Sequence, residues 1–382
     1  MQIIPIASGK GGVGKSLLSA NLAISLGKAG KKVLLVDLDL GASNLHLVIG
    51  QQAPKKGIGT FLTGAQDFDS IIADTDYENV QFIAGDSEIP GMSSIKTSQK
   101  NLLIKRLAKC DNVDYLILDL GAGTHLSILD FFLMSPQGII VTAPTVTATL
   151  NGYLFLKNAM FRMMHNTFKK GTKGYDYLKK LRSDSASLQR LYVPRLLEEL
   201  QKVDPENAAL FIERKNEFHP RLVMNCIDNP VDAEKAQKIR RSCAQYLGLD
   251  LEHLGVIYRD SLQDRALASR LPITVYKPQA VISQAIFRIA DRILESETRQ
   301  FDANYDVTDE GSDSFQIASE EALDDYSAKM AYVEELLGTG ALTPSELAET
   351  VKMQQLELNQ LKKENTLLKA KLLKAATLGF KV

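Results

Sequence analysis

The sequence predicts an α/β protein with a doubly wound, mostly parallel sheet, a helical insertion and a C-terminal coiled-coil helix. Short apolar runs alternate with helical patterns over the first 295 residues, which is typical of strands joined by crossover helices. A glycine-rich turn also joins the first apolar run to the first helical pattern. Continuous apolar runs such as 33–36 suit strands that are covered on both faces of the sheet.

The candidate strands are short apolar segments bounded by turn residues. They are Ile3–Ala7, Val33–Asp37, Val80–Ala84, Tyr115–Asp119, Ile139–Ala143, Leu222–Cys226, Leu254–Ile257 and Ile273–Tyr276.

The alternation predicts one domain over residues 1–295, with a helical, basic insertion at about 160–218. Between Lys157 and Arg182 there are eight Lys and Arg residues and one acid. Residues 296–342 are expected to form an acidic linker, because 302–325 contains nine acids and no Lys or Arg.

Residues 343–382 are expected to form a helix that starts with a capping box at Thr343 and Glu346. Apolar residues then recur at heptad spacing, with Asn365 at an a position and Glu and Lys at the flanking g and e positions. This pattern is typical of a parallel two-stranded coiled coil. The alternatives are one amphipathic helix packed on its own domain, and a basic tail that docks on anionic lipid.

Composition excludes several classes of protein. With 45 Lys and Arg residues against 46 Asp and Glu residues, the chain is not a generally basic nucleic-acid coat protein. Its three cysteines include no Cys-x-x-Cys pair, which argues against a disulfide framework, a zinc ribbon or an iron–sulfur site. The sequence has neither a recognisable leader nor a long apolar run, so we expect a cytoplasmic location.

The glycine-rich turn has the pattern of a phosphate-binding loop. Its residues are Gly9, Lys10, Gly11, Gly12, Val13, Gly14, Lys15 and Ser16. The glycines allow backbone N–H groups to converge on phosphate, and the following helix adds its positive end. Lys15 can reach the outer phosphates and the Ser16 hydroxyl can bind Mg²⁺, so the loop predicts a P-loop NTPase.

Acidic residues stand at the carboxyl ends of two candidate strands. Asp37 and Asp39 follow one strand, and Asp119 ends another. Doubly wound sheets place their ligands at these strand ends, so we expect all three carboxylates to face the crevice beside the loop.

The segment Lys-Gly-Gly-Val-Gly-Lys-Ser resembles the deviant Walker A motif of the MinD/ParA family of ATPases. The resemblance covers about 1–162 and 221–294. It includes Asn21-Leu22-Ala23, Val36-Asp37-Leu38-Asp39, Gly41 to Gly50, Asp119-Leu120-Gly121-Ala122-Gly123, Thr142-Ala143-Pro144-Thr145, Val223-Met224-Asn225, and Leu254-Gly255-Val256-Ile257 with Asp260, Ala266 and Pro272. Within the family, residues 119–123 look most similar to the FlhG/FleN type of flagellar-number regulator.

The resemblance implies catalytic roles for three residues. Lys10 matches the lysine that reaches the partner's nucleotide, Lys15 matches the phosphate-binding lysine, and Asp39 matches the aspartate that orients the attacking water. It also implies that Ser16, Asp37 and Asp119 hold the metal.

Other positions match nucleotide contacts of the family. Asn225 matches the asparagine that faces the adenine, and Asp260 lies in the loop that closes over the base. Leu17 ends the phosphate motif where many relatives have threonine, and Tyr258-Arg259 replaces a Pro-containing pair.

The function that the resemblance implies is a dimerising switch ATPase that uses ATP and Mg²⁺ to position or count an assembly such as a flagellum. Expected partners are a second copy, a protein that stimulates the ATPase or is positioned by it, and an anionic membrane surface reached through the C-terminal helix, which would make the protein peripheral at the inner face of the membrane. The alternatives are a low-turnover nucleotide-binding adaptor and a DNA-segregation ATPase, for which the 157–182 stretch would bind nucleic acid.

Overall fold

The computed structural model describes residues 1–41, 43–52, 55–85, 95–183, 192–299 and 307–338, with 348, 352, 355, 359, 364–366 and 368. The chain divides into two compact units, residues 1–325 and 326–382. The sheet and the site described below belong to the first unit. No helix in the described ranges is both long enough and apolar enough to cross a bilayer.

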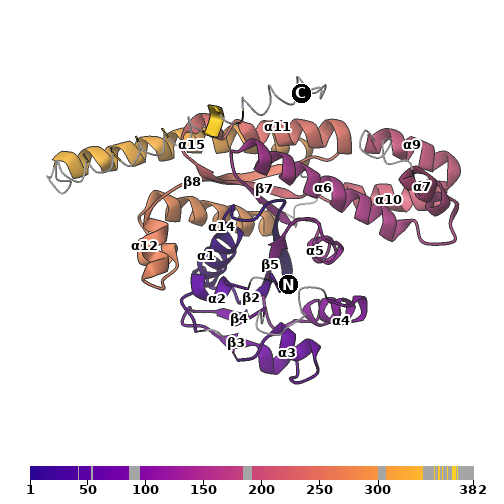
Figure 1. The fold of residues 1–382 in the computed structure, drawn as a ribbon, viewed down its shortest axis with the longest axis horizontal. Coiled ribbons are helices and arrows are strands. Elements are labelled where there is room, and N and C mark those ends of the chain that lie inside the picture. Colours follow the sequence, from indigo (N-terminus) through magenta and orange to yellow (C-terminus); the bar gives the residue numbers. More distant parts are fainter. Residues whose placement is uncertain are drawn as a thin grey trace. The chain divides into compact units, whose positions relative to one another are not determined.

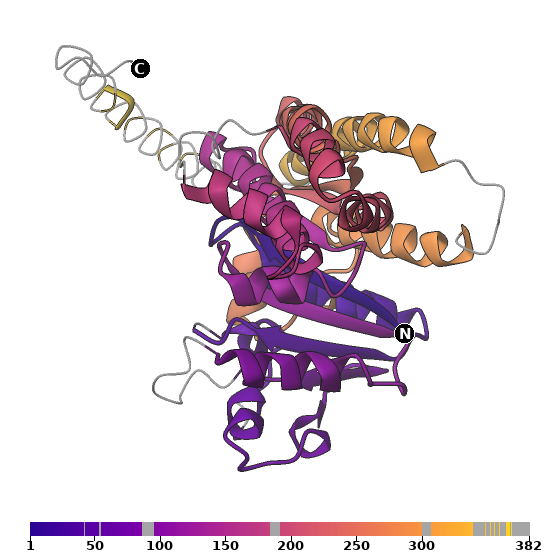
Figure 2. The same cartoon turned by 90° about the vertical axis from the view of Figure 1, so that its right-hand side faces the viewer.

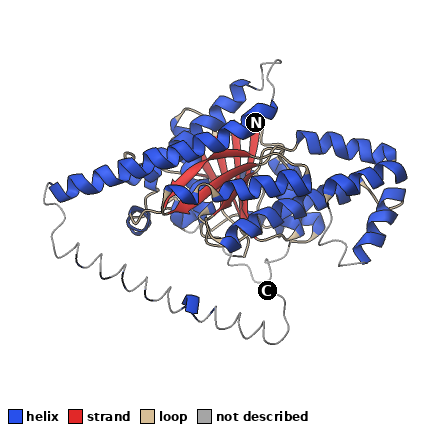
Figure 3. Cartoon of the chain, turned by 90° about the horizontal axis from the view of Figure 1, so that it is seen from above, coloured by secondary structure: helices blue, strands red, loops and turns tan. Residues whose placement is uncertain are grey.

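An eight-stranded sheet forms the centre of the first unit, in the order β3-β4-β2-β5-β1-β6-β7-β8 (Figures 1 and 3). The strands are β1 (Gln2–Ser8), β2 (Val33–Leu38), β3 (Ala73–Asp74), β4 (Val80–Ile83), β5 (Tyr115–Ala122), β6 (Ile139–Thr142), β7 (Arg221–Ile227) and β8 (Glu252–Tyr258). All neighbours pair in parallel except β3 with β4. The predicted doubly wound, mostly parallel sheet is therefore confirmed.

Helices cover both faces of this sheet, because its strands are apolar on both sides (Figure 3). One face packs against α1 (Lys15–Lys28), α2 (Leu45–Val48), α12 (Leu262–Ala268), α13 (Ile273–Tyr276) and α14 (Val281–Arg299). The other packs against α3 (Ile58–Leu62), α4 (Thr97–Leu107), α5 (Leu126–Phe132), α6 (Val146–Thr167) and α11 (Lys235–Ser242). Short turns of helix lie at Asp69–Ile71, Pro230–Asp232 and Cys243–Leu247.

The expected strand at Ile273–Tyr276 was wrong, because this segment is the short helix α13. Pro272 precedes it, and the backbone N–H and the hydroxyl of the buried Thr274 both donate to the Asn21 side chain of α1. These contacts bury the apolar run against a helix rather than in the sheet.

The expected insertion is helical in its described parts. It contains α7 (Lys173–Ser183), α9 (Val193–Val203) and α10 (Pro205–Glu217). Pro194 and Pro205 stand in the first turns of α9 and α10, where proline is tolerated. Asp204 caps α10, and its side chain also accepts a hydrogen bond from the Gly174 backbone N–H at 3.0 Å, which ties α10 to α7.

The segment expected to be a solvated acidic linker is largely the helix α15 (Val307–Gly338). Phe315, Ala318 and Ala322 form a buried stripe on its first part. Acids of this helix pair with arginines of α14, which lies beside it (Figure 2): Asp325 with Arg288 at 2.5 Å, and Glu321 with Arg292 at 2.6 Å. The first compact unit therefore extends past the domain end expected at residue 295.

The heptad pattern of 343–382 falls almost entirely outside the described residues. The few residues described there are helical. The coiled coil therefore stays a prediction.

Candidate functional site

The glycine-rich loop runs from the carboxyl end of β1 into α1, as the sequence predicted. Gly14 precedes the helix in a left-handed conformation, with φ at 89°, which a side chain would disfavour. No side chain caps the first N–H groups of α1. These donors and the positive end of the helix dipole form a site that favours an anion.

Lys15 and Ser16 open α1 next to Asp119 at the end of the adjacent strand β5. Lys15 is buried, with 7% of its surface exposed. The Ser19 hydroxyl donates to Asp119 Oδ1 at 2.9 Å, one turn after Lys15. Burial raises the pKa of Asp119 to about 6, although a hydrogen bond from Ser16, the charge of Lys15 and the bond from Ser19 lower it.

Asp37 and Asp119 are register partners on β2 and β5, and both carboxylates are buried. Asp37 accepts hydrogen bonds from the Ser43 hydroxyl at 2.7 Å and from the Asp39 backbone N–H at 3.0 Å. Burial raises the pKa of Asp37 to about 7, and the neighbouring Asp119 adds to the rise. Two buried carboxylates side by side favour a bound cation.

Asp39 follows β2 and is half-buried. Its carboxylate lies against Gly121, because a Cβ atom on that glycine would be 3.2 Å from Asp39 Oδ1. The predicted acids Asp37, Asp39 and Asp119 are therefore brought together beside the phosphate loop.

Lys10 is exposed at the tip of the loop, and its ammonium donates to the Thr147 hydroxyl of α6 at 3.1 Å. Large apolar side chains are exposed on the first turns of α5 and α6. Leu126 is 62% exposed, Val146 83% and Leu150 54%.

Asn225 lies under the phosphate loop. Its side-chain amide donates to the Val13 carbonyl oxygen at 2.8 Å, and only 4% of its surface is exposed. Asp260 lies beyond β8, where its carboxylate accepts a hydrogen bond from the Leu262 backbone N–H at 2.9 Å. Leu17 packs against the core under α1, so its side chain is partly buried among apolar residues.

A family model described as the CobQ/CobB/MinD/ParA nucleotide binding domain, CbiA, matches residues 4–273. The chain belongs to this family. The matched range takes in most of β1, all of β2 to β8 and the whole candidate site.

Curated relatives include both flagellar and cell-division proteins of the MinD/ParA family. The antiactivator FleN of Pseudomonas aeruginosa is 28% identical over 158 residues, which cover 41% of this chain and 56% of FleN. The flagellum site-determining protein YlxH of Helicobacter pylori is 34% identical over 157 residues, which cover 41% of this chain and 53% of YlxH. The septum site-determining protein MinD of Synechocystis is 32% identical over 149 residues, which cover 38% of this chain and 55% of that MinD. The chain thus spans about half the length of the curated relatives it matches.

Solved structures of MinD share the fold. The cell division ATPase MinD of Pyrococcus furiosus superposes with a TM-score of 0.51 at 20% identity, over 77% of this chain and 99% of that one. MinD of Pyrococcus horikoshii, complexed with Mg-ADP, superposes with a TM-score of 0.52 at 21% identity, over 79% of this chain and 99% of that one. At these identities the likeness concerns the fold alone.

Sequence reasoning missed some residues of this candidate site. Ser19 and Ser43 hold the carboxylates of Asp119 and Asp37. Ser19 lies one helical turn after Lys15, and this spacing could have revealed it. Asn151 of α6, which packs against Gly9, has no signal in the sequence because the contact depends on the tertiary fold.

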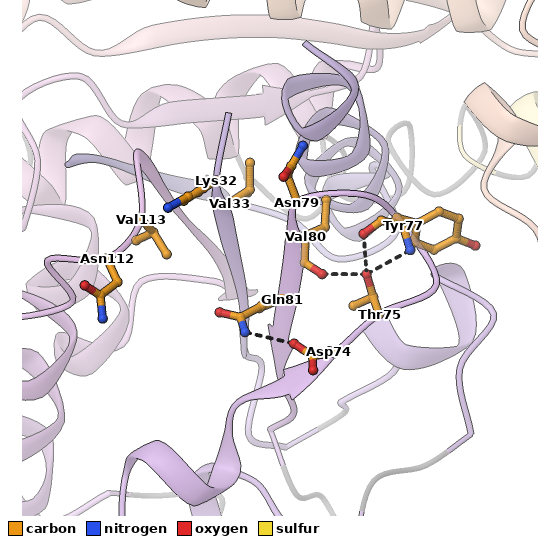
Figure 4. Close-up of a pocket in the computed structure, with 10 residues that line it drawn as sticks. All are labelled: Lys32, Val33, Asp74, Thr75, Tyr77, Asn79, Val80, Gln81, Asn112 and Val113. Atoms are coloured by element: carbon orange, nitrogen blue, oxygen red, sulfur yellow. Dashed lines mark hydrogen bonds between the residues drawn. The ribbon is translucent and has the colours of Figure 1, made fainter. Parts of the chain in front are cut away.

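Two hollows of the described surface lie away from this site. One groove of about 450 Å³ is lined by Lys32, Asp74, Tyr77, Asn79 and Asn112 among others, at the amino ends of β2 and β4 (Figure 4). The phosphate loop stands at the opposite, carboxyl ends of the strands. Among the described residues, no cluster of three or more His, Cys, Asp or Glu side chains could hold a metal by itself.

Proposed function

We propose that this chain is an ATPase of MinD/ParA type that binds Mg-ATP, dimerises around it and positions or counts a cellular assembly. The observation that carries the proposal is the grouping of Lys15, Ser16 and three carboxylates at the carboxyl ends of β1, β2 and β5. Positioning and electrostatics of this kind are most of what phosphoryl transfer requires.

The residues present fit a nucleotide with its magnesium ion. The glycine-rich backbone and Lys15 would hold the phosphates. Ser16 would ligate Mg²⁺, while Asp37 and Asp119 would hold its water ligands. Burial raises the pKa values of both carboxyl groups, and a divalent cation beside them would stabilise their charged forms. The absence of a complete protein cage in the described residues agrees with Mg²⁺, which keeps waters and phosphate oxygens as ligands. When bound, the ion supplies neutralisation of the charge on the phosphates.

Asp39 would orient the water that attacks the nucleotide. Its half-buried carboxylate faces the Gly121 segment that follows Asp119, so it is held near the phosphate loop while remaining accessible. Lys10 would act across the dimer. It is exposed and can exchange its contact with Thr147 for a partner's phosphate.

The exposed apolar residues Leu126, Val146 and Leu150 support dimerisation at this face, since large apolar side chains gathered near one site suit a protein interface. Asn225 and Asp260 are proposed to serve the base side of the nucleotide.

We propose, more specifically, that the assembly is a flagellum. This proposal is supported by the names of FleN and YlxH, while MinD is named for the septum site. We further propose a cytoplasmic protein that reaches an anionic membrane through the C-terminal helix and works with a stimulating protein partner.

Steady-state ATPase assays with Mg-ATP test the function. Asp39→Ala should retain ATP binding, trap the ATP-bound dimer and lower turnover about 100-fold or more, because the attacking water loses its orienting group. Lys15→Ala should weaken ATP binding or prevent the dimer from closing. Asp176→Ala is the matched control, because it removes an exposed carboxylate in the insertion.

Equal turnover of Asp39→Ala and the unaltered protein would contradict the role of Asp39. Tight ATP binding with negligible turnover of the unaltered protein would favour the adaptor. Binding to DNA with a steep loss on adding salt would favour the segregation ATPase.

A further inference from the structure

Helix α15 is anchored to the last residue of the edge strand β8. Tyr258 is 1% exposed, and its hydroxyl donates to the Ala322 carbonyl oxygen of α15 at 2.7 Å.

The first part of α15 packs along the rest of β8 as well. The backbone N–H of His253 donates to the Ser314 hydroxyl at 3.1 Å, and the His253 ring stacks on Phe315 with centroids 5.0 Å apart. Tyr258 and Ser314 thus mark two separate attachments of the same helix.

The strand end that α15 holds continues into contacts with β7. The Arg259 backbone N–H donates to the Ile227 carbonyl oxygen at 3.0 Å, and the Arg259 guanidinium pairs with Asp228 at 3.2 Å. The ends of β7 and β8 therefore form one connected unit.

The same end of β7 supports the phosphate loop. Asn225 donates to the Val13 carbonyl oxygen. Between Asn225 and Ile227 the pairing of β7 with β8 shifts register, and Cys226 has a φ of 57°. A non-glycine residue in the left-handed region is held there only by its surroundings. The position of Asn225 therefore depends on how the two strand ends are held.

We propose that α15 is a positioning element for the nucleotide site: through Tyr258 it holds the ends of β8 and β7, and so sets Asn225 under the phosphate loop. The inference rests on the proposed nucleotide binding and adds a regulator within the same chain. Because a loop already held in place loses less entropy on binding, docking of α15 strengthens nucleotide binding. By reciprocity, nucleotide binding stabilises the docked helix by the same factor.

The test measures Mg-ADP affinity of the full chain by calorimetry. Tyr258→Phe removes only the hydroxyl, so it should weaken Mg-ADP binding about fivefold, the equivalent of one hydrogen bond. Ser314→Ala loosens the other attachment of α15 and should weaken binding in the same direction. The matched control is Tyr192→Phe, which removes the hydroxyl of an exposed tyrosine before α9.

Hydrogen exchange distinguishes an effect of α15 on the nucleotide site from an effect on overall stability alone. Saturating Mg-ADP should slow amide exchange in residues 314–325 by a similar factor of about five, and this response should shrink in Tyr258→Phe. The double variant Tyr258→Phe/Asn225→Ala should lose less affinity than the two single losses combined, because both act on one connection.

Equal Mg-ADP affinity in Tyr258→Phe, Ser314→Ala and the unaltered protein would overturn the inference. An amide exchange rate in residues 314–325 that is the same with and without Mg-ADP would also overturn it. Either result leaves the proposed function intact as long as the unaltered protein binds Mg-ADP. Failure of the unaltered protein to bind would overturn both.

Discussion

Gly9 of the phosphate loop lies against the backbone of Asn151 in α6, such that a Cβ atom on Gly9 would come within 2.0 Å of the Asn151 carbonyl oxygen. The loop and α6 can pack this closely only because residue 9 has no side chain.

Gly9→Ala should therefore displace the loop and weaken nucleotide binding about 10- to 100-fold, the size expected for overpacking strain. Gly152→Ala is the matched control on the same helix, since its Cβ would meet its nearest atoms at 3.7 Å, an ordinary contact. It should leave binding unchanged, because alanine suits a helix interior better than glycine. Calorimetry with Mg-ADP distinguishes the two, and equal affinities would contradict the close packing.

Asp130 joins three helices through one carboxylate. Arg162 of α6 binds it in a bidentate manner at 2.6 and 2.8 Å, and Lys100 of α4 also pairs with it. Burial alone would raise the pKa of Asp130, but the hydrogen bonds from Arg162 and Lys100 outweigh burial and lower it. Asp130→Ala should cost about 3 kcal/mol of unfolding free energy, because two partly buried cations lose their partner.

Urea denaturation measures this loss. Glu199→Ala is the control, because it removes an exposed ion pair with Lys202 and should leave the midpoint unchanged. If both variants unfold at the same urea concentration, the Asp130 cluster does not hold the helices together.

His253 should make the protein sensitive to mild acid. Burial lowers the pKa of His253 to about 3, and the nearby Arg292 guanidinium lowers it further. Arg292 is paired with Glu321 of α15, and the Arg240 guanidinium of α11 lies over the Phe315 ring, 5.2 Å from its centroid. Below the ordinary pKa of 6.5 the unfolded chain binds a proton that the folded chain does not, so stability falls with pH by about 1.4 kcal/mol per unit.

At pH 5 this loss amounts to about 2 kcal/mol. His253→Phe keeps a ring for stacking on Phe315 and should remove this part of the pH dependence. The comparison is of urea midpoints at pH 7.5 and pH 5 for both proteins. A pH dependence that persists unchanged in the variant would rule out His253 as its source.

The heptad pattern of 343–382 predicts a dimer that forms without nucleotide. Removing these residues should make dimerisation depend on ATP, because only the exposed face around Lys10 would remain to join two copies. Light scattering of the truncated and complete proteins, each without nucleotide, measures this. A complete protein that is monomeric at micromolar concentration would argue against the coiled coil.

The end of the same helix predicts binding to anionic membranes. Residues 362–381 contain six lysines and one acid among leucines, and each lysine near an anionic surface contributes about 1 kcal/mol. The complete protein should sediment with anionic vesicles at low salt, more so with ATP if two tails act together. Neutral vesicles are the control. Protein that stays in the supernatant with both vesicle types would leave the coiled coil as the remaining role of the tail.

The sequence predicted the sheet because parallel strands covered on both faces are continuously apolar. It predicted the loop because a glycine-rich segment that ends in Gly14, Lys15 and Ser16 joins a strand to a helix. The strand Ile273–Tyr276 was wrong because a four-residue apolar run looks the same in a buried helix. The strand Ala73–Asp74 was not predicted, because a two-residue strand is too short to show a periodic pattern.

α15 was missed for a different reason. Its acids suggested a solvated linker, whereas Asp325 and Glu321 pair with arginines of α14 that precede them by 37 and 29 positions. Likewise, the resemblance matched Asn225 to an asparagine that faces the adenine and gave no sign of its hydrogen bond to the Val13 carbonyl oxygen. That contact forms only because β7 lies two strands from β1 in the folded sheet.

The position of α15 has a consequence for solubility. An open sheet ends in a strand whose outward N–H and carbonyl groups can recruit a strand from another molecule. On β8 two backbone groups have partners in the flanking helices: the His253 N–H donates to Ser314 of α15, and the Leu254 carbonyl oxygen accepts from Arg292 of α14 at 2.5 Å. The opposite border is the two-residue antiparallel β3, too short to serve as a template. Truncation before residue 307 would remove Ser314 and Phe315 of α15, while Arg292 of α14 would stay in place. Part of the β8 border would then be exposed, and aggregation of such a fragment is expected even where its core is intact.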